Sequence, residues 1–218
     1  MRLGTKLAEN RSVTNLYIAR HGQTTWNVEH RIQGMLDSPL TELGVLQASW
    51  LRECLSGVNL DVVYSSTSLR AMKTAEIVCQ GRKCPLVTYD DFREISLGEW
   101  EGMKRAEIDK LYPGIQQLYW NDPMKFYPVG QGETFIEVKK RVFNLLHKVL
   151  EENQGKNILL VTHTAIVKII MAHYDGRSME RLWDPPRILP ASLCHIVING
   201  DRNIIEKYGD TSHYKKNT

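Results

Sequence analysis

Short apolar runs alternate along the chain with longer segments in which apolar residues recur every three or four positions. The short runs predict β-strands at residues 16–19, 62–64, 86–88 and 158–161. The longer segments predict helices, because side chains three or four positions apart share one face of a helix. These helices cover residues 43–54, 69–79, 135–150 and 165–174. Regular alternation of strands and helices indicates an α/β fold with a largely parallel sheet.

The last apolar runs of the chain predict strands of another kind. Residues 193–198 and 204–208 flank Asn199-Gly200-Asp201, and this turn sequence favours an antiparallel pair. The predicted sheet is therefore mixed but mainly parallel, with helices flanking it in a three-layer arrangement. Thr41 precedes the first long helix and is its predicted N-cap.

The segment from residue 103 to residue 128 differs from the rest of the chain in being rich in aromatic residues and interrupted by three prolines. We interpret it as a helical cap inserted into the α/β domain. Ordinary packing of these aromatic residues against the core is the alternative, since aromatic side chains commonly bury area without any further role. Residues 1–13 and 211–218 are polar and are predicted to fray.

Length and composition favour one soluble domain spanning residues 1–218. The apolar runs are far shorter than the roughly 20 residues of a membrane span, and no secretory signal is recognisable at the start, so we expect a cytoplasmic protein.

A net charge of +3 without basic clusters argues against nucleic acid as a partner. The four cysteines lack C-x-x-C spacing and are predicted to be reduced.

Polar residues that could take part in catalysis follow the predicted strands. Ligands of open α/β sheets bind beyond the carboxyl ends of the strands, so residues in these places can converge on one site. Two histidines, two arginines and one carboxylate occupy such positions: Arg20, His21, Arg70, Glu94 and His163. This combination is suited to phosphoryl transfer.

Each of these residue types has a role in such a reaction. Guanidinium groups pair with two phosphoryl oxygens at once, which makes Arg20 and Arg70 the expected clamp. A neutral His21 would attack phosphorus and carry the group covalently. Glu94 would protonate the leaving group and then activate water, and a cationic His163 would stabilise charge in the transition state. The scheme requires no metal and no cofactor.

Other chemistries remain as alternatives. A zinc hydrolase could use His21, His163 and Glu94, although their spacing does not match H-E-x-x-H and two guanidiniums would repel the cation. A phospholigand-binding protein without turnover is a further alternative, but such a protein has no need of both a nucleophile and a proton donor. Sequence motifs for a P-loop, a dinucleotide site or a serine hydrolase are absent.

The sequence resembles the histidine phosphatase superfamily, in its phosphoglycerate-mutase-like branch. The motifs that carry the resemblance occur in family order over residues 14–200 and include those at residues 16–24, 31–34, 37–44, 64–75, 94–102, 132–134 and 161–163. The resemblance implies a mixed sheet with a small cap, a phosphorylated His21, an acid and base at Glu94, and phosphoryl contacts from Arg20, Arg70 and His163.

The same resemblance assigns further residues and favours one reaction. It implies phosphate contacts from Asn27 and Gln33, whereas Thr164 occupies a position where relatives commonly have glycine. The motif at residues 98–102 is similar to broad-specificity phosphatases, which favours hydrolysis over mutase-type transfer.

We expect a small phosphomonoester as the substrate. The cap aromatic residues Tyr119, Trp120, Phe126 and Tyr127, with few basic neighbours, favour a partly apolar leaving group. The sequence carries no distinct signal for an oligomeric interface.

Overall fold

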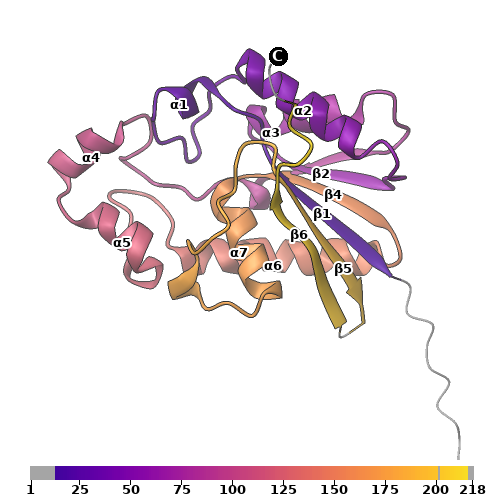
Figure 1. Cartoon of the computed structure of the whole chain (residues 1–218). Coiled ribbons are helices and arrows are strands. Elements are labelled where there is room, and N and C mark those ends of the chain that lie inside the picture. Colours follow the sequence, from indigo (N-terminus) through magenta and orange to yellow (C-terminus); the bar gives the residue numbers. More distant parts are fainter. Residues whose placement is uncertain (1–12, 201, 216–218) are drawn as a thin grey trace, which may run out of the picture.

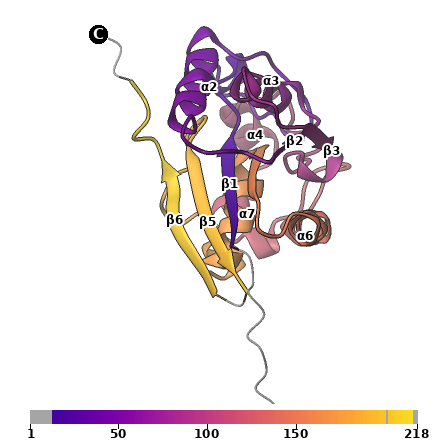
Figure 2. The ribbon, with the colours of Figure 1, turned by 90° about the vertical axis from the view of Figure 1, so that its right-hand side faces the viewer.

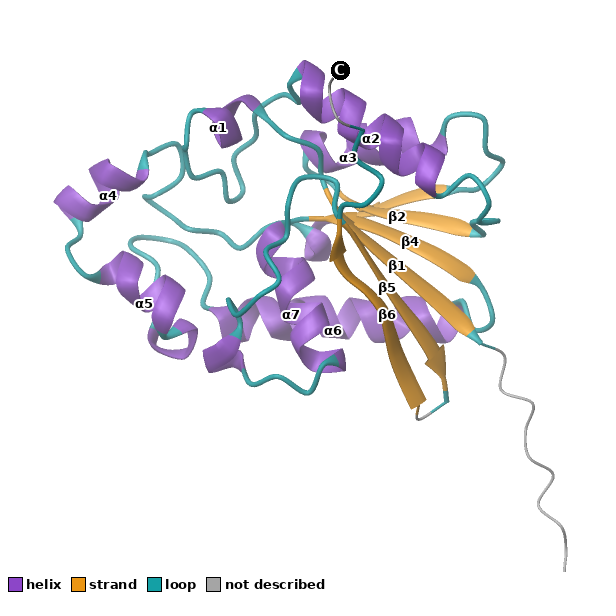
Figure 3. Ribbon diagram, in the orientation of Figure 1, coloured by secondary structure: helices purple, strands orange, loops and turns teal. Residues whose placement is uncertain are grey.

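A single mixed sheet forms the centre of the protein. The computed structural model describes residues 13–200 and 202–215. Within them six strands lie in the order β3-β2-β4-β1-β5-β6, and Figure 3 shows them as a twisted fan. The strands are β1 (Thr14–Arg20), β2 (Val62–Ser66), β3 (Leu86–Tyr89), β4 (Asn157–Thr162), β5 (Leu193–Asn199) and β6 (Arg202–Asp210).

The strand directions agree with the expectation from the sequence. β4 is parallel to both β1 and β2, and β3 is parallel to β2. β5 pairs antiparallel with β1 and β6 antiparallel with β5. The carboxyl ends of the four parallel strands therefore meet at one edge of the sheet, where residues of β1, β2 and β4 can share a site.

Helices cover both faces of this sheet, as Figure 2 shows. α2 (Glu42–Cys54) and α3 (Leu69–Cys79) lie on one face, and α6 (Phe135–Glu152) and α7 (Thr164–Tyr174) lie on the other. Alternate residues of β4 belong to two separate apolar clusters, Leu159 to one and Ile158 to the other. Burial on both faces explains why β4 is a continuous apolar run rather than an alternating one.

Hydrogen-bonding side chains define where these helices begin. The Thr41 hydroxyl accepts a hydrogen bond from the Gly44 amide at 3.0 Å, which confirms the predicted N-cap of α2. Thr134 and Glu137 form a capping box at the start of α6. The helix predicted over residues 69–79 coincides with α3, and the other long helices begin or end within two residues of the prediction.

The cap is helical and lies beyond the carboxyl ends of the parallel strands (Figure 1). It contains α4 (Arg105–Leu111), α5 (Ile115–Asn121) and the 3₁₀ turn η2 (Pro123–Lys125). Three shorter elements complete the described chain: α1 (Thr25–Val28), η1 (Asp90–Phe92) and η3 (Met179–Arg181). Some cap aromatic residues are core residues as well, because Tyr119 and Phe126 pack against Phe135 of α6.

The structure tests the prediction of frayed termini for only part of the two ends of the chain. Residues 1–12 and 216–218, like Asp201 of the predicted turn, lie outside the described residues. For residues 211–215 the prediction is wrong. Tyr214 packs against Trp50 with ring centroids 5.9 Å apart, and Lys215 forms an ion pair with Glu53. These contacts hold the segment against α2.

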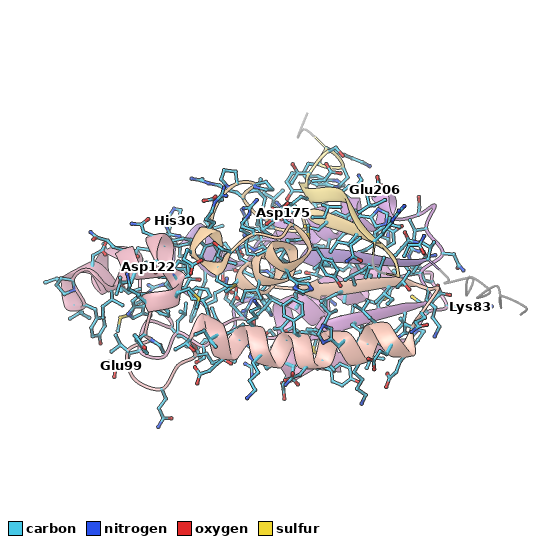
Figure 4. The ribbon with its side chains drawn as sticks, turned by 90° about the horizontal axis from the view of Figure 1, so that it is seen from below. His30, Lys83, Glu99, Asp122, Asp175 and Glu206 are labelled. Atoms are coloured by element: carbon cyan, nitrogen blue, oxygen red, sulfur yellow. The ribbon has the colours of Figure 1, made fainter. Side chains whose placement is uncertain are left out.

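Two further observations concern the whole described chain. Cys54, Cys79, Cys84 and Cys194 are free thiols. Within residues 13–200 and 202–215, none of the helices combines the length and apolarity that a bilayer crossing demands. Figure 4 shows the long axis of the molecule, with His30 and Asp122 toward the cap and Lys83 at the opposite end.

Candidate active site

A cavity of about 690 Å³ opens between the carboxyl edge of the sheet and the cap. Seven of the eight residues singled out in the sequence line it: Arg20, His21, Asn27, Gln33, Arg70, Glu94 and Thr164. The eighth, His163, is fully buried, and its ring centroid lies 5.2 Å from that of His21. The fold therefore brings all eight together, as expected for residues that follow neighbouring parallel strands.

His21 follows β1 and presents one particular nitrogen to the cavity. Its Nδ1 lies 2.7 Å from the Gly22 carbonyl oxygen. A carbonyl oxygen only accepts hydrogen bonds, so Nδ1 carries the proton and Nε2 keeps its lone pair. Burial lowers the pKa of His21 well below its usual value, and Arg70 and Arg20 lower it further. The neutral imidazole with a free Nε2 is the nucleophilic form.

Two guanidinium groups flank this imidazole. Nη1 of Arg70 donates to Asp37 Oδ1 at 2.9 Å and its Nη2 to the Gly34 carbonyl at 2.8 Å. Nη1 of Arg20 donates to the Ile188 carbonyl at 2.9 Å. Burial lowers the pKa of Arg20 to about 10, which still leaves it charged at neutral pH. Both groups are thus oriented by backbone and carboxylate partners rather than free to rotate.

Several buried donors at this place have no partner among the described residues. They are Nε of Arg20, Nε of Arg70 and Nδ1 of His163. Unpaired buried polar groups are rare in folded proteins because each costs free energy. Two of these groups belong to cations beside the same imidazole. The positive charge of the two arginines suits an anion with several oxygens, such as a phosphoryl group.

His163 is hydrogen-bonded to Ser66, a residue of β2 to which the sequence analysis gave no role. His163 Nε2 lies 2.8 Å from Ser66 Oγ, which also accepts a hydrogen bond from the Ser68 amide. The Ser66 hydroxyl can then donate to Nε2, which places the imidazole proton on the unpaired Nδ1.

The charge of His163 differs from the expectation. Burial lowers its pKa well below the usual value, and Arg70 lowers it further. These effects favour the neutral ring, whereas the sequence analysis considered the role that a cationic ring would have. A neutral ring still donates one hydrogen bond through Nδ1.

Glu94 lies at the cavity wall between two backbone amides. Oε1 accepts from its neighbour Ile95 at 3.0 Å and Oε2 from Ala165 of α7 at 3.3 Å. Burial raises the pKa of Glu94 despite these hydrogen bonds and the nearby arginines. A raised pKa makes the protonated form more available, as a proton donor requires.

Arg141 of α6 positions the segment that carries Glu94. Its guanidinium donates to the carbonyls of Asp91, Arg93 and Glu94 and to both oxygens of Glu133. Glu133 in turn accepts from the Ser96 amide at 2.9 Å. The sequence analysis quoted the motif at residues 132–134 but assigned no role to it. A lone arginine beside the apolar positions Val138 and Val142 of the predicted helix is the signal that could have indicated one.

The three remaining predicted residues present donors to the cavity. The side-chain oxygen of Asn27 accepts from the Thr24 amide at 3.1 Å, and that of Gln33 accepts from the Ser38 hydroxyl at 3.2 Å. These contacts leave the NH₂ group of each amide for a ligand. Thr164 is the first residue of α7, so the positive end of that helix dipole also faces the cavity.

The outer wall of the cavity has fewer of the expected aromatic residues than the sequence suggested. Tyr119, Trp120 and Trp183 line it, but Phe126 is buried in the core and Tyr127 is 70% exposed. The wall also has more basic residues than the sequence analysis expected, since Arg31, Arg105 and Arg187 line it.

The described part of the chain contains no group of three His, Cys, Asp or Glu residues suited to a metal ion.

Comparison with known proteins gives one consistent picture. A family model described as "Histidine phosphatase superfamily (branch 1)" matches residues 16–211. The structure is similar to that of YhfR from Bacillus stearothermophilus, with a TM-score of 0.88, 39% identity, and coverage of 92% of this chain and 98% of that one.

Two curated relatives carry different activity names. The "Uncharacterized phosphatase PhoE" of Bacillus subtilis is 31% identical over 92% of this chain and 97% of its own length. The "Probable phosphoglycerate mutase GpmB" of Proteus mirabilis is 34% identical, with 91% and 94% covered.

Proposed function

The chain belongs to the histidine phosphatase superfamily, and we propose that it is a phosphatase that hydrolyses small phosphomonoesters through a phosphohistidine intermediate on His21. The observation that carries this proposal is the free Nε2 of His21 beside unpaired buried donors of Arg20 and Arg70. A nucleophile and an anion site adjoin in one cavity. No metal or cofactor takes part in the proposed reaction.

In the first step, the phosphoryl group moves from substrate to enzyme. The Nε2 lone pair of His21 forms a bond to phosphorus while the bond from phosphorus to the ester oxygen breaks. The electron pair of that bond stays with the leaving oxygen, which takes the proton of Glu94. The substrate alcohol then departs, and Glu94 remains as a carboxylate.

In the second step, water removes the phosphoryl group from His21. The carboxylate of Glu94 accepts a proton from water as the water oxygen attacks phosphorus. The bond from phosphorus to Nε2 breaks, its electron pair returns to the ring, and inorganic phosphate leaves. One carboxyl group thus serves as acid and then as base, and the cycle returns the enzyme to its starting state.

Fixed donors stabilise the charge on the moving group in both steps. Arg20, Arg70 and the Nδ1–H of His163 would contact its oxygens, with Asn27, Gln33 and the amide of Thr164 as further donors. Because these donors are already oriented in the folded chain, little reorganisation accompanies the reaction. Removal of one such donor typically costs about 10²–10³-fold in rate.

Phosphate release in the presence of a chelator tests the proposed reaction. Wild-type enzyme with 4-nitrophenyl phosphate and EDTA is expected to release inorganic phosphate. His21→Ala is expected to abolish turnover, whereas His147→Ala, a change at an exposed histidine of α6, serves as the matched control. Loss of activity with EDTA, or normal activity of His21→Ala, would contradict the proposal.

Quenched turnover separates the remaining alternatives. Acid-labile, base-stable label on His21 from a ³²P-labelled substrate indicates the intermediate. Transfer of that label to phosphoglycerate, instead of water, would indicate a mutase, an activity named for one relative. Binding of phosphate without any turnover would indicate a phospholigand-binding protein. The cytoplasmic location, the absence of nucleic-acid and membrane partners, and the single domain stay predictions.

A further inference from the structure

We propose that Glu101 is a positioning residue for the phosphoryl-binding side of the site. Its carboxylate fixes the loop formed by residues 34–37, and that loop in turn holds the guanidinium of Arg70. This inference rests on the proposed function and deepens it, because it assigns a role to a carboxylate that does not line the cavity. Glu101 lies in the motif at residues 98–102, which the sequence analysis used only to favour hydrolysis.

The Glu101 carboxylate accepts hydrogen bonds from three backbone amides. Oε1 accepts from Met35 and from Leu97, each at 2.9 Å, and Oε2 accepts from Leu36 at 3.1 Å. The Leu36 amide also closes a turn with the Gln33 carbonyl at 3.0 Å. Hydrogen bonds to an ionised carboxylate are roughly twice as strong as those between neutral groups. Both oxygens of one carboxylate therefore hold the same loop.

The backbone of the 34–37 loop fits closely around this carboxylate. Gly34 has a φ of +54°, a conformation that residues with a side chain rarely adopt. A Cβ atom at this position would lie only 2.2 Å from Oε1 of Glu101. The turn of the backbone and the close approach of the carboxylate both require glycine here.

The carbonyl oxygens of the same loop bind two arginines. Nη2 of Arg70 donates to the Gly34 carbonyl at 2.8 Å, and its Nη1 donates to the Leu36 carbonyl at 2.7 Å. Nη2 of Arg93 donates to the Met35 carbonyl at 2.6 Å. Amides of the loop thus face a carboxylate, and its carbonyls face guanidinium groups. Each of these charges stabilises the backbone group that it contacts.

Arg70 depends on the 34–37 loop for its orientation. Its side chain is only 1% exposed, and besides the two carbonyls it contacts the carboxylate of Asp37, a member of the same loop. Its Nε has no partner among the described residues and is left for a phosphoryl oxygen. A shift of the loop would therefore shift this donor, and a misplacement of about 1 Å in a site can cost about 100-fold in rate. Glu101 acts on phosphate binding through this arginine.

Glu101→Gln is the isosteric test. Because each carboxylate oxygen accepts from one amide of the loop, a glutamine loses at least one of these hydrogen bonds whichever way its amide group is turned. We expect kcat/KM for 4-nitrophenyl phosphate to fall about tenfold through a raised KM, because a group that contacts the phosphoryl oxygens in both the bound substrate and the transition state is displaced. The affinity for inorganic phosphate should fall with it.

Glu99→Gln is the matched control. Glu99 is an exposed residue of the same segment (Figure 4), and its carboxylate accepts from the Tyr112 hydroxyl rather than from the 34–37 loop. The substitution removes one negative charge, as Glu101→Gln does. Wild-type values of kcat and KM are expected.

A second background shows whether the effect passes through Arg70. In Arg70→Met the guanidinium that the loop holds is gone, so adding Glu101→Gln is expected to change kcat/KM by less than about twofold. General damage to the fold would lower kcat/KM by the same factor in both backgrounds. That result, or an unchanged KM in Glu101→Gln, overturns the inference and leaves the phosphatase activity standing.

Gly34→Ala reaches the same contact from the other side. The added methyl group would displace the carboxylate of Glu101 while the negative charge is kept. We expect a fall in kcat/KM in the wild-type background and little further change in the Arg70→Met background. Unchanged kcat/KM in Gly34→Ala overturns the inference, even where Glu101→Gln fails to fold.

Failure of the proposed function gives a different result. If wild-type enzyme releases no phosphate from 4-nitrophenyl phosphate, the phosphatase proposal fails, and calorimetry with inorganic phosphate tests the positioning role by itself. Weaker binding by Glu101→Gln than by Glu99→Gln supports that role. Equal binding by the two variants overturns it.

Discussion

At the scale of single residues, hydrogen bonds decide which nitrogen each of two neighbouring imidazoles presents. The Gly22 carbonyl accepts a hydrogen bond from Nδ1–H of His21, so Nε2 keeps its lone pair and is the proposed nucleophile. Ser66 occupies Nε2 of His163 and leaves Nδ1 as a donor. The rings are only 5.2 Å apart, and in the proposed mechanism one attacks phosphorus while the other stabilises charge.

Replacement of Ser66 tests this division of roles. In Ser66→Ala the proton of His163 is no longer held on Nδ1, so we expect kcat to fall by about 10–100-fold with a smaller change in KM. Nitrogen NMR of His163 should show a shift from the Nδ1–H toward the Nε2–H tautomer. Ser68→Ala removes a buried hydroxyl that has no partner in the described chain and is the control. An unchanged tautomer in Ser66→Ala would refute the assignment.

The pH dependence of kcat/KM follows from opposite pKa shifts at two residues. His21 must be neutral, and its lowered pKa places the acid limb below the range of an ordinary histidine. Glu94 must be protonated, so activity falls as pH rises through its raised pKa. In Glu94→Gln the basic limb should disappear while the acid limb stays, measured with 4-nitrophenyl phosphate. Ionisation of the substrate affects the wild-type enzyme and the Glu94→Gln variant equally. An identical basic limb in both profiles would therefore exclude Glu94 as the group that causes it.

The dependence of the rate on the leaving group is a second test of the role of Glu94. Glu94→Gln should slow hydrolysis of alkyl phosphates more than that of nitrophenyl phosphate, because a poor leaving group depends more on the proton. Equal slowing of both would argue against Glu94 as the acid.

At the scale of elements, α6 positions Glu94, the proposed general acid, without lining the cavity itself. Its residue Arg141 donates to the carbonyls of Asp91, Arg93 and Glu94, in the segment that follows β3, and to the Glu133 carboxylate. The side chains of Arg141 and Glu133 are only 17% and 21% exposed, so the pair is shielded from water. This contact connects the longest helix of the described chain to the segment that carries Glu94.

Loss of this pair should affect chemistry and stability together. Arg141→Met is expected to lower the free energy of unfolding by about 2 kcal/mol, because Glu133 keeps a largely buried charge without its partner. We also expect a fall in kcat and little change in the affinity for inorganic phosphate, since Arg20 and Arg70 keep their contacts. Lys140→Met, at an exposed neighbour, is the control. Weaker phosphate binding with unchanged kcat would contradict this role.

At the scale of the whole molecule, the C-terminal segment supports the active site from outside. The Tyr214 hydroxyl donates to the Pro190 carbonyl, and its ring packs on Trp50 of α2. Two residues before Pro190, the Ile188 carbonyl accepts from Arg20. Residues from the end of the chain, the loop before β5 and the end of β1 therefore form one continuous set of contacts.

Removal of the Tyr214 ring tests this connection. Tyr214→Ala should lower the free energy of unfolding by about 2 kcal/mol through lost packing and a lost hydrogen bond. For a chain of this size that corresponds to a fall in Tm of roughly 4–8 °C. We further expect weaker binding of phosphate, because the loop that orients Arg20 loses its support. Lys215→Ala, which breaks only an exposed ion pair, should change Tm little. A Tyr214→Ala variant with wild-type Tm would exclude this role.

The sequence by itself determined the elements and the edge at which function lies. The helix predicted over residues 69–79 is α3, and the strand predicted over residues 158–161 lies within β4. Both predictions depend on local spacing of apolar side chains, which a sequence displays directly. The convergence of Arg20, Glu94 and His163 was also predictable, because parallel strands bring their carboxyl ends to one edge.

Only the tertiary structure decided which hydrogen-bond partners and which degree of burial these residues have. Ser66 and His163 are 97 residues apart, and no local pattern shows that their side chains meet. Nor does spacing distinguish Tyr119 at the cavity from Phe126 in the core. Hydrogen bonds, burial and unpaired charges depend on which distant segments come into contact, and the folded chain alone specifies those contacts.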